Sequence, residues 1–217
     1  MRLSAAQLAQ FARYRDELLD CNQRLNLTAI RDPTAVEELL FLDSLACLLV
    51  PVPQGAAVLD VGSGAGLPGL PLKIARPDLQ LTLLEATGKK ARFLEHVVAS
   101  LGLADVTVAA ERAETASGRG AFDVVAAKAV ADMAVLLELT LPFVTDGGLV
   151  LAHKKGMRLA EELRRADRAL LILGGQLEPP RHYELGGEER QIVVVRKVRP
   201  TPPEYPRRPG VPARQPL

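Results

Sequence analysis

Residues 57–69, AVLDVGSGAGLPG, have the residue types and spacing that point most clearly to chemistry. A short apolar run with Asp60 near its end leads into a turn with glycines at positions 62, 64, 66 and 69. Glycine has no Cβ, so it lets the turn tighten and lets the backbone approach a ligand closely. A buried strand followed by such a turn is typical of α/β sheets that bind nucleotides. We therefore predict a nucleotide-type cofactor site at this turn.

The glycine spacing fits two kinds of cofactor site. The pattern G-x-G-x-x-G at positions 64–69 is that of dinucleotide sites. The pattern G-x-G-x-G at positions 62–66, preceded by Asp60, is that of S-adenosylmethionine (SAM) sites in Rossmann-like methyltransferases. We favour SAM, because Asp60 can lie near its cationic methionine end, whereas the carboxylate would repel a pyrophosphate. A tight turn without a ligand and a non-enzymatic module that binds NAD are the alternatives.

Further candidate ligand contacts follow the other predicted strands. Glu85 ends the apolar run 81–84, and its carboxylate can accept hydrogen bonds from both hydroxyls of a cofactor ribose. The carboxyl ends of parallel strands meet at one edge of a sheet, and ligands bind in the crevice there. We therefore expect the same edge to hold the residues that follow the later strands: Glu85, Ala86, Thr87, Arg112, Ala113, Glu114, Lys128, His153, Lys154, Lys155 and Gly156.

Two helices are predicted before the glycine turn. Ser4 and Gln7 form a capping box that opens a helix over residues 4–22. Asp32-Pro33 supplies an N-cap and a first helical residue for a second helix, over residues 33–49. The first helix has one apolar face at helical spacing, made by Leu8, Phe11, Tyr14, Leu18 and Leu19.

From residue 57 onward, predicted strands alternate with predicted helices. This alternation predicts a parallel, doubly wound sheet of the Rossmann-like methyltransferase type. Gly186-Gly187 joins the last two strands by a short turn, so these strands form an antiparallel C-terminal hairpin. The seven expected strands span 57–61, 80–85, 105–109, 122–127, 147–153, 181–185 and 191–198, and the helices 68–75, 88–101, 131–141 and 158–173.

Three segments follow from this pattern: an N-terminal helical appendage (1–54), a cofactor-binding domain (55–198) and a proline-rich tail (199–217). The tail has seven of the 16 prolines, so we expect it to be extended, with no helix. Residues 196–217 have six Lys and Arg against one Glu, a net charge of +5. Because the whole chain is +1, the rest is −4, which indicates an anionic partner at one edge. Tyr205 could stack on a base of such a partner.

The composition narrows the class of protein further. Aromatic residues make up 4% of the chain, too few for a sheet that binds single strands by stacking. Cys21 and Cys47 have no metal-ligand spacing, so we expect no metal, and both thiols are expected to pack as small hydrophobic groups. No secretory signal or membrane-spanning run is present, because Asp43 and Pro51 interrupt the longest apolar run. We therefore expect a cytoplasmic protein with no membrane contact.

Several motifs together resemble the RsmG/GidB family. They are Asn26-Leu27-Thr28, Phe41-Leu42-Asp43-Ser44, LDVGSGAGLPG, Lys89-Lys90, Arg112-Ala113-Glu114, Lys155-Gly156 and the tail YPRRPGVPARQPL. The resemblance covers nearly the whole chain. It implies a SAM-dependent enzyme that methylates N7 of one guanine in 16S ribosomal RNA. The implied partner is that RNA, the small ribosomal subunit or an assembly intermediate, and the protein is expected to be a monomer.

The resemblance also implies roles for individual residues. Lys128 stands where the family usually has Arg, and Leu40 where it usually has His, so neither family role carries over directly. The implied cofactor contacts are Gly62, Gly64, Gly66, Leu67, Glu85, Ala86, Thr87, Ala113, Glu114 and Lys128. The candidate substrate contacts are Lys128, Lys155, Asn26 and Asp43. The candidate RNA contacts are Lys89, Lys90, Lys154, Lys155, Arg199, Arg207, Arg208 and Arg214.

Methylation at N7 agrees with the absence of an obvious catalytic base. Guanine N7 is a lone-pair acceptor with no proton to remove. Methylation of an amino group usually uses an N/D-P-P-aromatic turn after the fourth strand, where this chain has KAVA over 128–131. Methylation of a pyrimidine carbon needs a nucleophilic Cys, and both cysteines precede the sheet. A methyltransferase that acts on a small molecule or on another RNA is the alternative.

Overall fold

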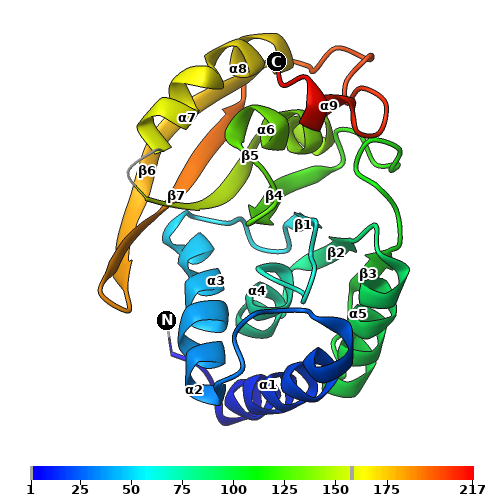
Figure 1. Ribbon diagram of the computed structural model, residues 1–217, viewed down its shortest axis with the longest axis vertical. Coiled ribbons are helices and arrows are strands. Elements are labelled where there is room, and N and C mark those ends of the chain that lie inside the picture. Colours follow the sequence, from blue (N-terminus) through cyan, green and yellow to red (C-terminus); the bar gives the residue numbers. More distant parts are fainter. Residues whose placement is uncertain (1, 157–158) are drawn as a thin grey trace.

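The computed structural model describes residues 2–156 and 159–217, and its centre is a seven-stranded sheet (Figure 1). The strand order is β3-β2-β1-β4-β5-β7-β6. Strands β1 to β5 are parallel, and β7 runs antiparallel to both β5 and β6. The predicted fold class, a mostly parallel sheet with an antiparallel C-terminal hairpin, is confirmed. The strands are β1 (Ala57–Val61), β2 (Gln80–Leu84), β3 (Val106–Ala109), β4 (Phe122–Lys128), β5 (Val144–Lys155), β6 (Gly175–Leu185) and β7 (Glu188–Lys197).

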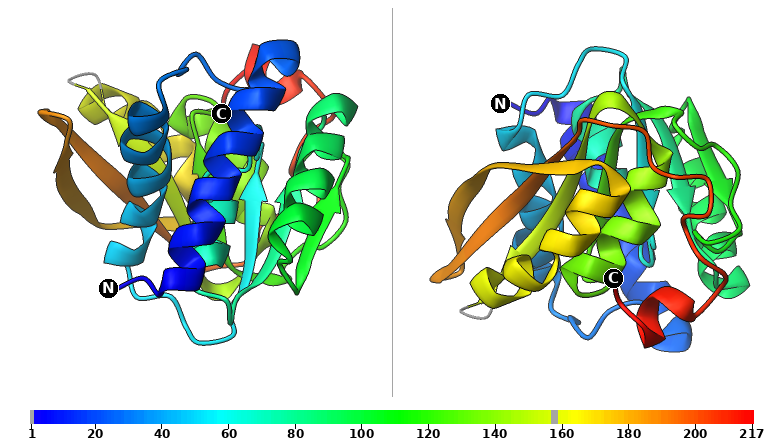
Figure 2. Two further views of the ribbon diagram at one scale, coloured as in Figure 1. Left: turned by 90° about the horizontal axis from the view of Figure 1, so that it is seen from below. Right: turned by 90° about the horizontal axis from the view of Figure 1, so that it is seen from above.

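Helices cover both faces of the sheet (Figure 2). One face holds α1 (Ala5–Leu25), the segment 33–49, α4 (Gly69–Ala75) and α5 (Gly88–Leu101). The other face holds α6 (Met133–Thr140), α7 (Leu159–Arg165) and α8 (Asp167–Leu173). Neighbouring strand residues such as Val58 and Leu59 belong to two different apolar clusters, one on each face. The central strands are thus buried on both sides, which is why they are almost continuously apolar.

Helix α1 begins at the predicted capping box. The Ser4 hydroxyl accepts from Gln7 N, and the Gln7 side chain accepts from Ser4 N. Phe11, Tyr14 and Leu18 are buried as expected, whereas Leu8 is 56% exposed. The buried residues of α1 belong to the same apolar cluster as residues of the sheet, so α1 packs directly on the sheet side of the core.

The prediction of a single helix over residues 33–49 is wrong. Asp32 does cap its start, accepting from Ala35 N. The segment then changes geometry three times, through α2 (Pro33–Val36), the π-helix η1 (Glu37–Leu42), α3 (Asp43–Leu45) and the 3₁₀-helix η2 (Ala46–Leu49). Single π-helical turns are rare and frequently lie at functional sites. Here the π-helix ends directly before Asp43.

The other differences lie in the C-terminal half. β6 begins at Gly175 rather than at 181, and the helix expected over 158–173 is two helices, α7 and α8. Residue 158, its expected start, lies outside the described residues. The tail contains a short helix, α9 (Val211–Arg214), against our expectation. Its Pro212 lies in the first turn, where a missing N–H costs no hydrogen bond. Within the described ranges, we find no helix long and apolar enough to cross a membrane.

Candidate active site

The glycine turn lies where β1 meets β4, the point at which the strand order reverses. Such switch points are where open α/β sheets bind their ligands. The N–H groups of Gly62 and Ser63 donate to Leu84 O, which ties the turn to the end of β2. A Cβ on Gly62 would come within 3.0 Å of Val130 Cγ2, so the loop after β4 packs directly on the turn.

Gly66 shows why this turn requires glycine. Its φ is +94°, a conformation that residues with a Cβ rarely adopt, and a Cβ would lie 2.8 Å from the Tyr14 hydroxyl. That hydroxyl donates to Ala65 O, at 2.5 Å. Helix α1 therefore contacts the glycine turn directly, which the sequence pattern did not predict.

Asp60 lies completely buried behind the turn. Its Oδ2 accepts from Gly69 N at 2.9 Å, and its Oδ1 has no hydrogen-bond partner among residues 2–156 and 159–217. Burial raises the pKa of Asp60 to about 7. A buried carboxylate with an unpartnered oxygen favours a nearby cation, and the methionine end of SAM is cationic. Asp60 and the glycine turn thus fit SAM.

Glu85 lies at the end of β2, as the ribose role requires. Its Oε2 accepts from Gly64 N at 2.9 Å and its Oε1 from Thr87 N at 2.7 Å. The carboxylate thus joins the glycine turn to the loop that follows β2. Ala113 is buried and Glu114 half-buried, and Glu114 Oε1 accepts from Gly210 N of the tail. The cofactor roles of these residues stay predictions.

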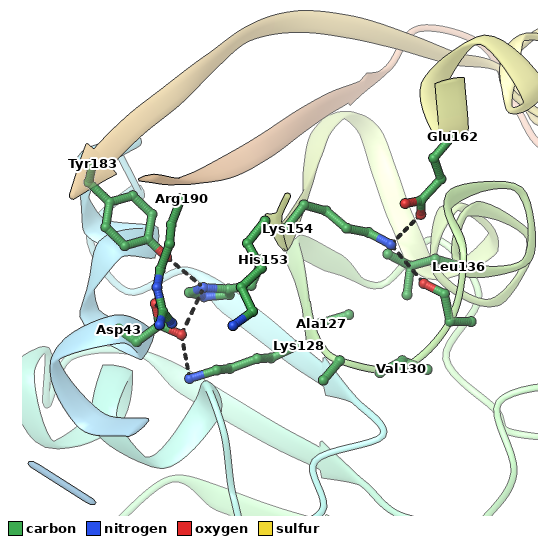
Figure 3. A pocket seen from close by; sticks show the side chains of 13 residues that line it. Asp43, Ala127, Lys128, Val130, Leu136, His153, Lys154, Glu162, Tyr183 and Arg190 are labelled. Atoms are coloured by element: carbon green, nitrogen blue, oxygen red, sulfur yellow. Dashed lines mark hydrogen bonds and ion pairs between the residues drawn. The ribbon is translucent and has the colours of Figure 1, made fainter. Parts of the chain in front are cut away.

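An open pocket of about 300 Å³ lies at the ends of β4 and β5 (Figure 3), and its lining residue Val130 packs on Gly62 of the glycine turn. Its walls come from the end of β4 and its following loop, the end of β5, α6, α7 and the β6–β7 hairpin. A further wall comes from Asp43 in the segment 33–49, which we call the π-helical segment. We call this pocket the acceptor pocket, because it lies next to the predicted cofactor turn. It is lined by Asp43, Ala127, Lys128, Ala129, Val130, Ala131, Leu136, His153, Lys154, Lys155, Glu162, Tyr183 and Arg190.

Asp43 is the centre of a charged cluster in this pocket. Lys128 Nζ lies 2.7 Å from its Oδ2, and Arg190 Nη1 lies 3.1 Å from its Oδ1. The Tyr183 hydroxyl donates to Oδ1 at 2.8 Å. Burial opposes ionisation, but the ammonium of Lys128 and hydrogen bonds from Lys128 and Tyr183 hold the pKa of Asp43 below its ordinary value. The carboxylate is 4% exposed, so it fixes two cations rather than presenting a free acceptor.

The π-helix completes the surroundings of Lys128. The carbonyls of Leu39 and Leu40 lie 3.5 and 3.3 Å from Lys128 Nζ. With Asp43, these carbonyls give the ammonium three acceptors, one for each of its protons. Lys128 therefore joins β4 to the π-helix, and only the backbone of Leu40 takes part in this contact.

His153 and Cys47 form a second, buried polar contact near Asp43. His153 Nε2 lies 3.0 Å from Cys47 Sγ. Burial lowers the pKa of His153 to about 3 and raises that of Cys47 well above its ordinary value. The thiol is thus neither exposed nor ionised, so it is no nucleophile. It packs in an apolar cluster, as expected, but it also contacts an imidazole, which was not expected.

Lys154 stabilises the wall of the acceptor pocket that lies opposite the Asp43 cluster. Its ammonium donates to Ala131 O at 2.8 Å and pairs with Glu162. Glu162 Oε1 also accepts from Met133 N at 2.6 Å. These contacts fix the loop between β4 and α6, so Lys154 is engaged within the protein rather than free for RNA.

The remaining candidate RNA contacts differ in exposure. Lys89, Lys155 and Arg208 are exposed, and Lys90 is half-buried. Arg199 donates to Leu171 O, and the Nε of Arg214 donates to Gly210 O. Asn26 is exposed at the C-cap of α1 in a left-handed conformation, and it does not line the acceptor pocket.

Arg207 is an anchor of the tail. Its backbone N–H and its guanidinium donate to Glu138, whose side chain is completely buried. We expect Arg207→Ala to lower the free energy of unfolding by roughly 2 kcal/mol, because Glu138 would remain buried without a counter-charge. Urea unfolding measures this loss.

The exposed neighbour Arg208 is the matched control. Arg208→Ala should change the free energy of unfolding by no more than about 0.5 kcal/mol. If both variants unfold at the urea concentration of the wild type, Arg207 does not anchor the tail, and its side chain is available to bind RNA.

Sequence reasoning missed Tyr183 and Arg190. They pair directly across the β6–β7 hairpin, so both side chains lie on one face of it. A two-residue turn at Gly186-Gly187 already fixes this pairing, because residues at equal distances from the turn on the two strands lie opposite each other. The sequence therefore had a signal for the pair, but none for its contact with Asp43.

Comparisons with known proteins address the family and the fold. The family model GidB, described as rRNA small subunit methyltransferase G, matches residues 7–193. A ribosomal RNA small subunit methyltransferase G of Chloroflexus aggregans is 48% identical, over 99% of this chain and 92% of the relative. The protein of the same description from Roseiflexus castenholzii is 47% identical, over 100% and 94%. A SAM-dependent methyltransferase structure from Aquifex aeolicus shares the fold, with a TM-score of 0.57 and 16% identity over 83% of this chain and 97% of that one.

Proposed function

We propose that this chain, which belongs to the family of small-subunit rRNA methyltransferases G, transfers the methyl group of SAM to N7 of one guanine in 16S rRNA. The observation that carries the proposal is the juxtaposition of the glycine turn and the acceptor pocket. Val130 lines the pocket and also packs on Gly62, so the two sites share a wall.

The glycine turn, Asp60 and Glu85 would hold the cofactor, which supplies an electrophilic methyl group when bound. The chain's own contribution is orientation. The π-helix, β4 and the hairpin fix the acceptor pocket through Asp43, and Lys154 with Glu162 fixes its other wall. Held pairs of reactants can reach effective molarities of about 10⁵ M or more.

The ionisable groups of the pocket agree with an acceptor that has no proton. N7 of guanine needs no general base. The pocket's imidazole, His153, is buried and neutral at physiological pH because burial lowers its pKa to about 3. Its Nε2 is engaged with Cys47, so it is not free to accept a proton from a substrate.

Further parts of the proposal concern partners and organisation. We propose that Lys89, Lys90, Lys155 and Arg208 contact the phosphates of the RNA, supported by their positive charge. We also propose a cytoplasmic monomer that acts on the small ribosomal subunit or an assembly intermediate. Residues 1–54, 55–198 and 199–217 would serve as the helical appendage, the catalytic domain and the tail.

Methyl transfer tests the function directly. Tritiated SAM is incubated with small ribosomal subunits from a strain that lacks this protein, and the labelled nucleotide is mapped. We expect label at N7 of a single guanine in 16S rRNA. Label on another RNA or on small molecules alone would support the alternatives, and absence of label with intact SAM binding would exclude this acceptor.

A further inference from the structure

Aromatic side chains are scarce in this chain and are mostly buried. It contains five Phe, three Tyr and no Trp. Tyr14 is buried under the glycine turn, and Tyr205 packs against an apolar cluster of the sheet. Among the described residues that line the acceptor pocket, Tyr183 is the one Phe, Tyr or Trp. Tyr183 lines the pocket and also packs against an apolar cluster of the sheet, so it is the aromatic side chain at which we look for contact with a substrate base.

Tyr183 is fixed at its hydroxyl end. The hydroxyl donates to Asp43 Oδ1 at 2.8 Å and lies 3.4 Å from His153 Nδ1. Figure 3 shows the side chain reaching from the hairpin toward this cluster. Burial, and then the hydrogen bond to Asp43, raise the pKa of Tyr183, so the phenol stays neutral. The ring thus has one defined orientation at the wall of the pocket.

We propose that the ring of Tyr183 is the surface on which the target guanine stacks during methyl transfer. This inference rests on the proposed function. Many enzymes that modify a base act on a single strand or extrude the base, and they hold it by stacking between aromatic and apolar side chains. Across the pocket from the hairpin, Val130 and Leu136 supply the apolar side chains.

The charge that develops on the base gives the ring a second effect. Methylation at N7 leaves a positive charge on the guanine. An aromatic face attracts a cation, and this attraction grows as the charge forms. The stack should therefore support the chemical step as well as binding, and it requires the ring rather than the hydroxyl.

The test compares two substitutions at Tyr183 with a matched control. Tyr183→Leu removes the ring, whereas Tyr183→Phe keeps the ring and removes the hydrogen bond to Asp43. His182→Leu replaces the exposed neighbour, which points to the other side of the hairpin. The assay is methyl transfer to small ribosomal subunits, with kcat and KM measured separately, alongside SAM affinity and thermal unfolding.

We expect Tyr183→Leu to lower kcat/KM by roughly 10- to 100-fold, the range of base–aromatic stacking. Tyr183→Phe keeps the ring and should lose clearly less activity than Tyr183→Leu, whereas His182→Leu should stay within about threefold of the wild type, with SAM affinity unchanged. Full activity of Tyr183→Leu would overturn the inference. Equal loss in Tyr183→Leu and Tyr183→Phe would also overturn it, because the hydroxyl would then be the essential group. A wild type that methylates no subunit RNA overturns the proposed function itself.

Discussion

Asp43→Asn is expected to lower the free energy of unfolding by roughly 3–5 kcal/mol and to reduce methyl transfer at least about 100-fold. The substitution keeps the shape of the side chain but removes its charge. Lys128, whose side chain is 14% exposed, would then lose its counter-charge, and Arg190, 12% exposed, would keep only its pair with the exposed Glu188. Urea unfolding at pH 7 and the methyl-transfer assay measure the two losses.

The pH dependence of Asp43 has a defined sign. Its pKa in the folded protein lies below its ordinary value. The carboxylate therefore stabilises the fold at pH values above its unfolded pKa, and this contribution is lost as the pH falls through the folded pKa. In Asp43→Asn the contribution is absent at every pH, so stability should fall less steeply in acid.

An exposed ion pair supplies the control for this prediction. Asp20 pairs with Arg24, and both side chains are more than two-thirds exposed. Asp20→Asn should change stability by less than about 1 kcal/mol. If Asp43→Asn is as stable as Asp20→Asn, then the cluster does not fix the pocket in the way we describe.

The sheet and its hairpin could be predicted because their signals are local. The glycine turn, the alternation of apolar runs with helical patterns and the Gly186-Gly187 turn each act within a few residues. The same kind of signal placed Asp60 and Glu85 at strand ends, where the structure has them. Local patterns thus predict the edge of the sheet at which the site lies.

The acceptor pocket could not be predicted because it depends on contacts between distant parts of the chain. Asp43 and Tyr183, 140 residues apart, meet only after the hairpin packs against the π-helical segment. No local pattern distinguished that segment from an ordinary helix. The prediction that Lys128 contacts the substrate had the same limit. Its three hydrogen-bond acceptors lie in the segment 33–49, which precedes the whole sheet in the sequence.

The tail shows a different limit of sequence reasoning. Its positive charge indicates an anionic partner, but charge alone does not say where that partner is. The guanidinium of Arg207 faces the buried carboxylate of Glu138, an anion within the same chain. Arg119, which lies outside the tail, also donates to the tail carbonyls of Thr201 and Pro202. Part of the basic character of the tail therefore serves to dock it.

Asp60→Asn is expected to weaken SAM binding by roughly 10- to 100-fold at pH 8 while the fold remains intact. The asparagine can still accept from Gly69 N, but it supplies no negative charge to the cationic end of the cofactor. Calorimetric titration with SAM measures the affinity. Asp123, which accepts from Ala57 N at the other end of β1, offers a control: Asp123→Asn should bind SAM as the wild type does.

The pH profile separates a charge effect of Asp60 from a structural one. Burial raises the pKa of Asp60 in the folded protein to about 7, so the fold favours the protonated side chain. This contribution to folding stability is complete below the unfolded pKa and is lost as the pH rises through 7. SAM affinity should follow the opposite course, rising between pH 6 and pH 8 as the carboxylate ionises. Asp60→Asn should show neither trend and should be at least as stable as the wild type at pH 8.

Wild-type affinity at pH 8 in this variant would mean that the buried charge has no part in holding the cofactor. The opposite pH trends of stability and affinity follow from one cause, because a carboxylate that is unfavourable in the empty site becomes favourable beside a bound cation.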